Sequence, residues 1–167
     1  MGQRRDCDGG PPAGDFSSID DLGAYTQAFE LNCLSTIAMC KEAVPAMQVQ
    51  HWGRVLAITS IAVRQPIAGL ILSNTARAGV TGFLKTLARE VAADGVTVNS
   101  LQPGFHATER IQALHDDPSS LGALVPAGFV GEASDFGAVA AFVCSEAARY
   151  LTGTAIPVDG GAYAGLL

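Results

Sequence analysis

Residues 53–82 decide the fold of this chain, and they read GRVLAITSIAVRQPIAGLILSNTARAGVTG. Within them, residues 54–59 (RVLAIT) are a short apolar run, which predicts a fully buried strand of a parallel sheet. Residues 61–70 contain a proline and a glycine, and they predict a loop. Over residues 72–93 apolar side chains recur at helical spacing. We therefore expect a strand, a loop and a long helix in succession.

The alternation of strands and helices continues on both sides of this stretch. Upstream, apolar residues predict one long helix, continuous or interrupted, over residues 20–49. Downstream, residues 96–101 (VTVNSL) and 154–158 (TAIPV) predict two more strands, with a helix over 132–147 between them. The polar segment before that helix predicts one short helix near 108–115. Alternation of this kind predicts an α/β fold, in which helices cover both faces of a parallel sheet.

Composition limits the classes of function that the chain can have. Its 167 residues suit a single domain, and 49% of them are hydrophobic, which is enough for a core. A formal net charge of -6 argues against a nucleic-acid or anionic-membrane partner, since both need a basic patch. No apolar run approaches the ~20 residues of a membrane helix, and no secretory signal opens the chain. The four cysteines form no C-x-x-C pair, so we expect reduced thiols in the cytoplasm.

Five segments of the chain carry motifs whose order and spacing matter together. They are GGPP at residues 9–12, FELN at 29–32, Ser60, VNSLQPG at 98–104 with Thr108, and YLTG with VDGG over 150–161. Asn32 and Ser60 stand 28 residues apart, and Ser73 and Arg77 follow one helical turn apart. This arrangement over residues 9–161 resembles the short-chain dehydrogenase/reductase family, and most closely its 3-oxoacyl-acyl-carrier-protein reductase-like members.

The resemblance implies both a fold and a chemistry. The fold would be Rossmann-like, with three layers, α, β and α, around a parallel sheet. The reaction would be the reduction of a carbonyl, or the oxidation of a secondary alcohol, in a small molecule, with NAD or NADP as the cofactor. The implied catalytic residues are Asn32, Ser60, Ser73 and Arg77, and the implied cofactor-binding residues are Gly9, Arg77, Pro103, Gly104 and Thr108.

Two positions depart from the pattern of the family. Ser73 stands where the family has a tyrosine that gives a proton to the substrate oxygen. Arg77 stands where it has a lysine that lowers the pKa of that tyrosine. An aliphatic hydroxyl is a far weaker acid than a phenol, and an arginine does not exchange protons near neutral pH. The positive charge is retained and the acid is weakened, which predicts poor turnover by the usual route.

The family pattern is also incomplete at its start. No G-x-x-x-G-x-G segment, the turn that binds the pyrophosphate of a dinucleotide, occurs before residue 9, and residues 1–8 match nothing in the family. We therefore interpret residues 9–167 as the C-terminal part of a Rossmann-like domain, with strands 5, 6 and 7 of the family order 3-2-1-4-5-6-7. Such a part would expose the edge of the strand over 54–59.

Each candidate side chain also has a structural interpretation. A hydroxyl side chain often caps a helix, and this is the alternative for Ser73 and for Thr108. The alternative for Arg77 is a surface cation on a helix. Ser60 suits a plain strand-end hydroxyl, and Asn32 a hydrogen-bonding group that supports the helix. His106, beside the Pro-Gly turn, is expected to be solvated, with a role as the missing acid as the alternative.

For the chain as a whole, the alternative to an enzyme is a non-catalytic protein that uses the fold for association. The helices over about 20–49 and 72–93 would then pair in a homodimer or homotetramer. Four small residues would let such helices approach closely: Ala76, Ala78, Gly79 and Gly82. A third interpretation is a truncated gene product without a function of its own.

Overall fold

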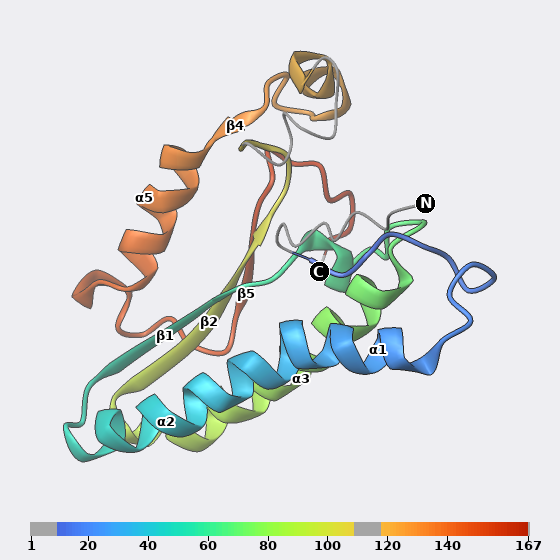
Figure 1. The fold of residues 1–167 in the computed structure, drawn as a ribbon. Coiled ribbons are helices and arrows are strands. Elements are labelled where there is room, and N and C mark those ends of the chain that lie inside the picture. The colour runs from blue at the N-terminus through green and yellow to red at the C-terminus, as the bar shows by residue number, and fades with distance from the viewer. Residues whose placement is uncertain (1–9, 109–117, 167) are drawn as a thin grey trace.

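The computed structural model describes residues 10–108 and 118–166, and a parallel sheet of three strands forms its centre (Figure 1). The strands are β1 (Gly53–Ile58), β2 (Val96–Pro103) and β5 (Ala155–Val158), and their order across the sheet is β1-β2-β5. β1 and β2 pair along the whole length of β1, and β5 pairs with the second half of β2. The carboxyl ends of the three strands therefore lie at the same edge of the sheet.

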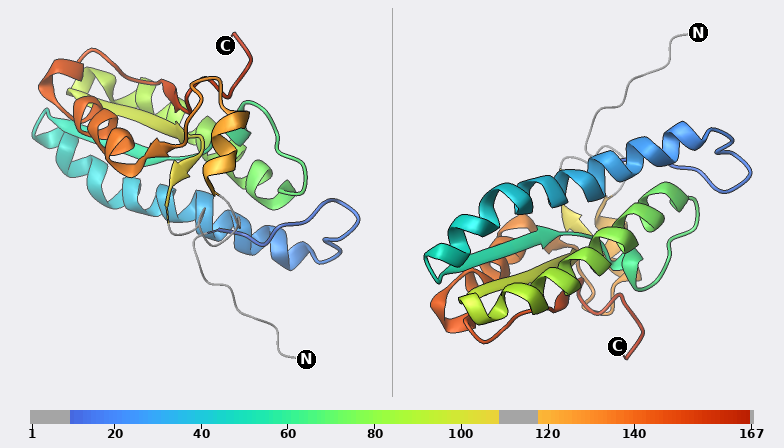
Figure 2. Two further views of the ribbon diagram at one scale, coloured as in Figure 1. Left: turned by 90° about the horizontal axis from the view of Figure 1, so that it is seen from above. Right: turned by 90° about the horizontal axis from the view of Figure 1, so that it is seen from below.

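Helices cover both faces of this sheet (Figures 1 and 2). α2 (Ser35–Val49) and α3 (Ile71–Val91) lie together on one face, and α1 (Leu22–Phe29) precedes α2 on the same side. α5 (Ala133–Val143) lies on the other face. The expected three-layer, Rossmann-like arrangement around a parallel sheet is confirmed. Within the described ranges, none of the helices combines the length with the apolarity that a bilayer crossing requires.

The main core lies between the sheet and the layer of α2 and α3. The buried residues of α3 follow one another at spacings of three and four, so they form one apolar face of the helix. This face packs on β2 and on α2 in a single cluster: Cys33, Cys40, Val44, Val80, Leu84, Ala88, Val91, Val96 and Val98. Burial of one large apolar side chain contributes about 1.5–3 kcal/mol. The cluster therefore determines how the two helices lie on the sheet.

Among the described residues β1 is an edge strand of the sheet, as expected for the C-terminal part of the fold, and the prediction of a fully buried strand over residues 54–59 is wrong. The strand ends at Ile58, which is 63% exposed. β2, at the centre of the sheet, is buried along nearly its whole length. Both runs are apolar, and an apolar run does not distinguish a central strand from an edge strand, because long-range pairing sets the order of strands.

The region expected as one helix over residues 20–49 divides into three parts. α1 and α2 are α-helices, and Glu30–Leu34 between them is a wider π-helical turn. α1 begins after Asp21, whose carboxylate accepts from the Gly23 amide at 2.8 Å and so satisfies an amide at the helix end. The interruption matters for function, because Asn32 lies in the π-helical turn.

The polar segment after β2 holds two very short strands. β3 (His106–Ala107) and β4 (Gly131–Glu132) pair in parallel, and Pro118–Leu124 is a 3₁₀ helix. The short helix expected near 108–115 falls almost entirely outside the described residues, and so does the candidate residue Gly9. The helix expected over 132–147 is α5, which ends at Val143.

The three described cysteines are expected to differ sharply in thiol reactivity. Cys33 and Cys40 lie in the core, and burial raises the pKa of both thiols, whereas Cys144 is exposed. Because the thiolate is the reactive form, the disulfide reagent DTNB should modify Cys144 rapidly and the other two only as the chain unfolds. The measurement is made in a Cys7→Ser background. Adding Cys144→Ser should remove the fast phase of thiol modification. A fast phase that persists in this variant would contradict the buried placement of the other thiols.

Candidate active site

Ser60 stands where β1 ends and the following loop begins. The Thr59 amide, one residue earlier, donates to the Leu101 carbonyl of β2 at 2.8 Å, which fixes the strand end to the sheet. Ser60 has an extended backbone, and its Oγ accepts from the Ala62 amide at 3.1 Å. This contact caps the 3₁₀ helix Ile61–Val63. It uses a lone pair of the hydroxyl and not its proton, so the O–H group keeps its capacity to donate.

Ser73 and Arg77 meet on α3 beside the end of β1. α3 begins at Ile71, so Ser73 lies in its first turn and is not its N-cap. Arg77 Nε donates to Ser73 Oγ at 3.2 Å, and Arg77 Nη1 donates to the Thr59 carbonyl at 2.9 Å. Arg77 is half-buried and is therefore not a simple surface cation. It ties α3 to Thr59, which directly follows β1 and directly precedes Ser60.

Asn32 lies in the π-helical turn between α1 and α2. Such a turn is rare, and inside an α-helix it frequently occurs at a functional site. The Asn32 side-chain amide is half-buried and donates to the Ala28 carbonyl at 3.1 Å. Asn32 and Thr59 both line a groove between α2 and β1. The structure therefore brings Asn32 to the side of the sheet where α3 carries Ser73 and Arg77.

Pro103, Gly104 and Thr108 lie where β2 leaves the sheet. β2 ends at Pro103, and a Cβ on Gly104 would lie 2.7 Å from the Cα of Asp159. Glycine is thus required here by the close packing of two chain segments. Thr108 is exposed, and its amide donates to the His106 carbonyl at 2.8 Å. Because ligands of α/β folds bind outside the carboxyl ends of strands, this turn belongs to the candidate site.

A group of polar side chains at this end of the sheet was not expected from the sequence. Arg64 donates through Nε to Gln102 Oε1 at 2.8 Å and through Nη2 to the Ala155 carbonyl at 2.7 Å. Its guanidinium carbon lies 5.4 Å from the centre of the Tyr163 ring. Gln102 is fully buried, and its Nε2 has no hydrogen-bond partner among the described residues. No local pattern marks this group, since its members come from segments far apart in the chain.

His106 is buried, so the prediction of a solvated loop histidine is wrong. Its Nδ1 lies 3.2 Å from the Gly104 carbonyl oxygen. Its ring meets Phe136 of α5 edge-on, with 5.2 Å between the ring centres. These contacts give the histidine a packing role, in which it holds the turn after β2 against α5.

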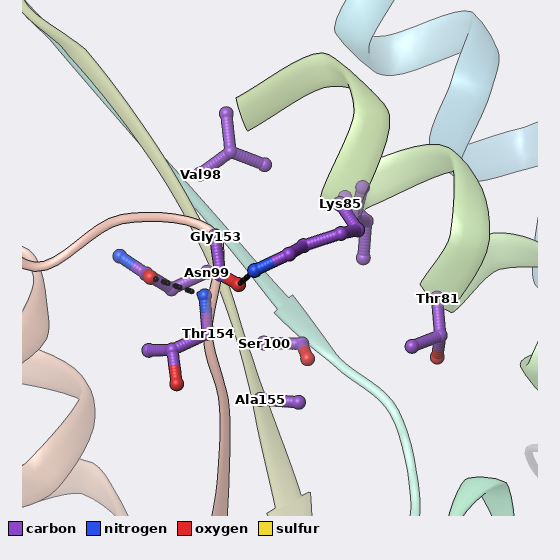
Figure 3. A pocket seen from close by; sticks show the side chains of 9 residues that line it. Thr81, Lys85, Val98, Asn99, Ser100, Gly153, Thr154 and Ala155 are labelled. Atoms are coloured by element: carbon purple, nitrogen blue, oxygen red, sulfur yellow. Dashed lines mark hydrogen bonds between the residues drawn. The ribbon is translucent and has the colours of Figure 1, made fainter. Parts of the chain in front are cut away.

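A separate small cavity of about 110 Å³ lies between α3 and the strands β2 and β5 (Figure 3). Lys85 reaches across it, and its Nζ donates to the Gly153 carbonyl at 2.6 Å. On the same side, the Thr154 amide donates to Asn99 Oδ1 at 3.2 Å. None of the expected site residues lines this cavity. We therefore assign it no part in the candidate site.

Arg77→Lys is expected to loosen the junction between α3 and β1. A lysine keeps the charge but lacks the planar fork that reaches Ser73 and Thr59 together. Loss of one hydrogen bond from a charged, half-buried group should lower the free energy of unfolding by about 1–2 kcal/mol. Urea denaturation followed by circular dichroism measures this free energy of unfolding. Arg89→Lys, at an exposed position of the same helix, is the matched control, and equal effects of the two changes would contradict the role of Arg77.

Most of the chain matches a model of a known protein family. A family model described as "Enoyl-(Acyl carrier protein) reductase" matches residues 9–163. The chain belongs to the short-chain dehydrogenase/reductase family. The match includes β1, α3 and the turn after β2, so membership in this family rests on most of the chain and not on one motif.

Curated members of the family match the chain over part of their length. The 3-oxoacyl-[acyl-carrier-protein] reductase FabG of Salmonella typhimurium is 39% identical over 140 residues, which are 83% of this chain and 57% of that protein. FabG of Escherichia coli K12 is 38% identical, again over 83% of this chain and 57% of that protein. Nodulation protein G of Azospirillum brasilense is 32% identical, over 87% of this chain and 60% of that protein. The chain thus spans little more than half the length of these relatives.

Solved structures share the fold. YwfH, described as an NADPH-dependent reductase involved in bacilysin biosynthesis, is 26% identical, with a TM-score of 0.89 over 95% of this chain and 65% of that chain. A protein described as a dehalogenation enzyme has a TM-score of 0.85 at 23% identity, which shows the fold alone. The solved structures therefore agree with the family membership in fold.

Proposed function

We propose that this chain forms the substrate end of an NAD(P)-dependent oxidoreductase that reduces a carbonyl to a secondary alcohol. The matched 3-oxoacyl-[acyl-carrier-protein] reductases suggest a 3-oxoacyl thioester as the substrate. The observation that carries the proposal is the contact of Arg77 with both Ser73 Oγ, at 3.2 Å, and the Thr59 carbonyl, at 2.9 Å. Through it, the Ser73 hydroxyl and a fixed positive charge lie against Thr59, the residue before Ser60, at the carboxyl end of a parallel strand, where α/β folds bind ligands.

Carbonyl reduction adds a hydride to the carbonyl carbon and a proton to the carbonyl oxygen. In this proposal the Ser60 hydroxyl donates to that oxygen and stabilises the negative charge that develops on it. Ser73 occupies the place of the proton donor, with its hydroxyl held by Arg77. Asn32 supports a chain of waters that returns the proton. Because an arginine keeps its own protons near neutral pH, the proton leaves from a hydroxyl or from water.

The donor groups of the chain fit one end of a nicotinamide cofactor, which supplies the hydride when it is bound. The Arg77 guanidinium suits the hydroxyls of a ribose, and the Thr108 hydroxyl beside Pro103 and Gly104 suits the nicotinamide carboxamide. The diphosphate end has no such match, since no strand directly precedes α1 among the described residues and no glycine-rich turn joins them. Among the described residues, the donor groups therefore fit the nicotinamide end, with NAD and NADP as equal candidates.

A chimaera tests the proposal. Residues 9–163 replace the matching region of the E. coli K12 reductase, and cofactor absorbance reports hydride transfer from NADPH or NADH to 3-oxoacyl thioesters and ketones. We expect turnover roughly 10²–10⁴-fold slower than that of the unmodified E. coli enzyme, because a strong general acid is absent. Ser60→Ala should slow the chimaera further. A folded chimaera that binds cofactor without oxidising it above background would overturn the proposal.

Association without catalysis is the second candidate function, and the outer faces of the helices favour it. Large apolar residues that are more than half exposed follow one another along α1, the π-helical turn and α2: Leu22, Leu31, Leu34 and Met39. On α3, Ala76 is buried inside the chain and Gly79 faces Phe29. Of the four small residues expected to permit close approach, Ala78, Gly79 and Gly82 are therefore exposed to a partner.

Sedimentation and calorimetry distinguish this second candidate from the first. A homodimer or homotetramer that binds neither NADH nor NADPH would support association as the function. Leu31→Glu with Met39→Glu should then dissociate the oligomer, because it places charges in the apolar contact. Leu124→Glu, at an exposed position away from these helices, is the control. A chain that is monomeric at all concentrations would exclude this candidate.

A further inference from the structure

Arg64 connects the loop after β1 to the other two strands of the sheet. Its Nε donates to Gln102 Oε1 of β2 at 2.8 Å, and its Nη2 donates to the Ala155 carbonyl of β5 at 2.7 Å. The Tyr163 ring, from the segment after β5, lies 5.4 Å from the guanidinium carbon. None of these three partners is a carboxylate. Neutral hydrogen bonds, and not an ion pair, therefore define where this half-buried side chain lies.

The contact with Arg64 leaves one end of the Gln102 side chain unsatisfied. An arginine offers donors only, so the amide of Gln102 turns its oxygen toward Arg64 and its nitrogen away. The residue is 0% exposed, and its Nε2 has no hydrogen-bond partner within the described ranges. A buried donor without an acceptor lowers stability, and an apolar side chain at this position would avoid that loss. Such departures from good packing are expected where a residue serves function, so the contact points to a role beyond stability.

This polar network lies beside the hydroxyl groups of the candidate site. In the register of the sheet, Leu101 stands opposite Ile58. Gln102 therefore reaches the level of Thr59, which directly precedes Ser60. Alternate side chains of β2 belong to the core under α3, and Gln102 falls on that same face. The network is thus on the side of the sheet where α3 carries the candidate proton donor.

Ser60 and Arg64 flank the two ends of one short 3₁₀ turn. At its start, Ser60 Oγ accepts from the Ala62 amide at 3.1 Å, and at its end the Arg64 amide donates to the Ile61 carbonyl at 2.9 Å. A 3₁₀ helix rises about 2 Å per residue, so these ends lie within about 8 Å of each other. Ala62 is the buried residue of the turn, so packing fixes the turn at one point. The side chain of Arg64 supplies a second fixed point, and the two together limit how the turn can rotate.

We propose that Arg64 is a positioning residue, which fixes the turn Ile61–Val63 and thereby the place of the Ser60 hydroxyl. Its planar fork binds Gln102 and the Ala155 carbonyl together, which ties the end of the turn to β2 and β5. The proposal rests on the proposed function, in which Ser60 donates to the substrate oxygen. Arg64 acts through Ser60 and touches no reacting atom. A misplacement of about 1 Å can lower the rate of an enzyme about 100-fold, so a loosened turn should slow the reaction.

Hydrogen exchange in the chain itself tests the fixing of the turn without a substrate. Arg64→Lys keeps the charge but lacks the fork that reaches both acceptors. We expect the ratio of the exchange rate at the Ala62 amide to that at the Leu84 amide to rise about tenfold. Leu84 is buried in the core, so its amide reports on the stability of the whole fold. Arg89→Lys, at an exposed position of α3, is the matched control and should leave the ratio unchanged.

Gln102→Met tests the same contact from its other side. It removes the acceptor of Arg64 and the unsatisfied donor together, at nearly constant volume. The ratio of exchange at Ala62 to exchange at Leu84 should rise as it does for Arg64→Lys. The urea midpoint should stay near that of the unmodified chain, because the lost hydrogen bond and the lost unsatisfied donor offset each other.

A double-mutant cycle in the chimaera with the E. coli K12 reductase tests whether Arg64 acts through Ser60. The rate of hydride transfer is measured in single turnovers at saturating substrate. Arg64→Lys should lower this rate about tenfold and leave the half-saturating substrate concentration within about twofold, because the displaced hydroxyl acts in the transition state. In the Ser60→Ala chimaera, Arg64→Lys should change the rate less than about twofold.

Two results would overturn the proposal. The first is an exchange ratio that either Arg64→Lys or Gln102→Met leaves unchanged. The second is a loss of rate on Arg64→Lys that is the same with and without the Ser60 hydroxyl, which shows that Arg64 acts elsewhere. Failure of the proposed function is separable from both. A chimaera that binds cofactor and transfers no hydride contradicts the proposed function, whereas the exchange ratio at Ala62 still decides whether Arg64 fixes the turn.

Discussion

Ser73→Tyr combined with Arg77→Lys should raise the rate of carbonyl reduction roughly 10²–10⁴-fold in the chimaera with the E. coli reductase. A phenol has a pKa of about 10, and a neighbouring ammonium lowers it, so the new side chain donates a proton far more readily than a serine hydroxyl. The two positions are already adjacent, because Arg77 Nε lies 3.2 Å from Ser73 Oγ across one turn of α3. Cofactor absorbance with a 3-oxoacyl thioester measures the rate.

Ser73→Phe combined with Arg77→Lys is the matched control for this experiment. It adds the same ring without any hydroxyl at position 73, so its rate should be no higher than that of the unmodified chimaera. The dependence on pH gives a second check. With tyrosine the rate should fall as the pH rises through the lowered pKa of the phenol, since the donor then loses its proton. Equal rates for the tyrosine and phenylalanine variants would show that position 73 is not the site of proton transfer.

Leu101→Ala should produce the largest loss of stability among single substitutions considered for this fold. Leu101 is 0% exposed, lies in the central strand β2, and stands opposite Ile58 of β1 and Ile156 of β5. Removing a buried leucine side chain leaves a cavity and costs about 2–5 kcal/mol. Because the free energy of unfolding of a domain is only about 5–15 kcal/mol, this change should move the urea midpoint strongly.

Leu124→Ala is the control for the leucine substitution. Leu124 is 68% exposed, so its truncation removes little contact and should change the free energy of unfolding by less than about 0.5 kcal/mol. Urea denaturation followed by circular dichroism compares the two variants. A loss below about 1 kcal/mol at Leu101 would mean that the three strands do not form one packed sheet.

The order of helices and strands could be predicted because local patterns encode it. The apolar spacing of α3 follows the helical period, and the runs at β1 and β2 have the composition of strands in a parallel sheet. Two groups four residues apart on a helix are neighbours, so the proximity of Ser73 and Arg77 also followed from spacing alone. The π-helical turn at Asn32 could not be predicted, since nothing in ELNCL differs in composition from an ordinary helix.

The contacts that hold α3 and other distant segments against the strand ends could not be predicted from local patterns. That Arg77 binds the Thr59 carbonyl depends on how α3 packs over β1. That Arg64 binds Gln102 depends on the passage of the chain past the end of β2. The burial of His106 depends on α5, thirty residues later in the chain, where Phe136 packs against it. Such contacts join segments that no short window of sequence contains.

The sequence by itself determined the family pattern, the helix that carries Ser73 and Arg77, and the change from a phenol and an amine to a hydroxyl and a guanidinium. These are properties of residue type and spacing, which are local. The tertiary structure alone decided how far the side chains of β1 are exposed and that Leu56 and Ile58 line a groove beside α2. The physical reason is that burial depends on which strands pair, and pairing is a long-range contact that an apolar run permits but does not specify.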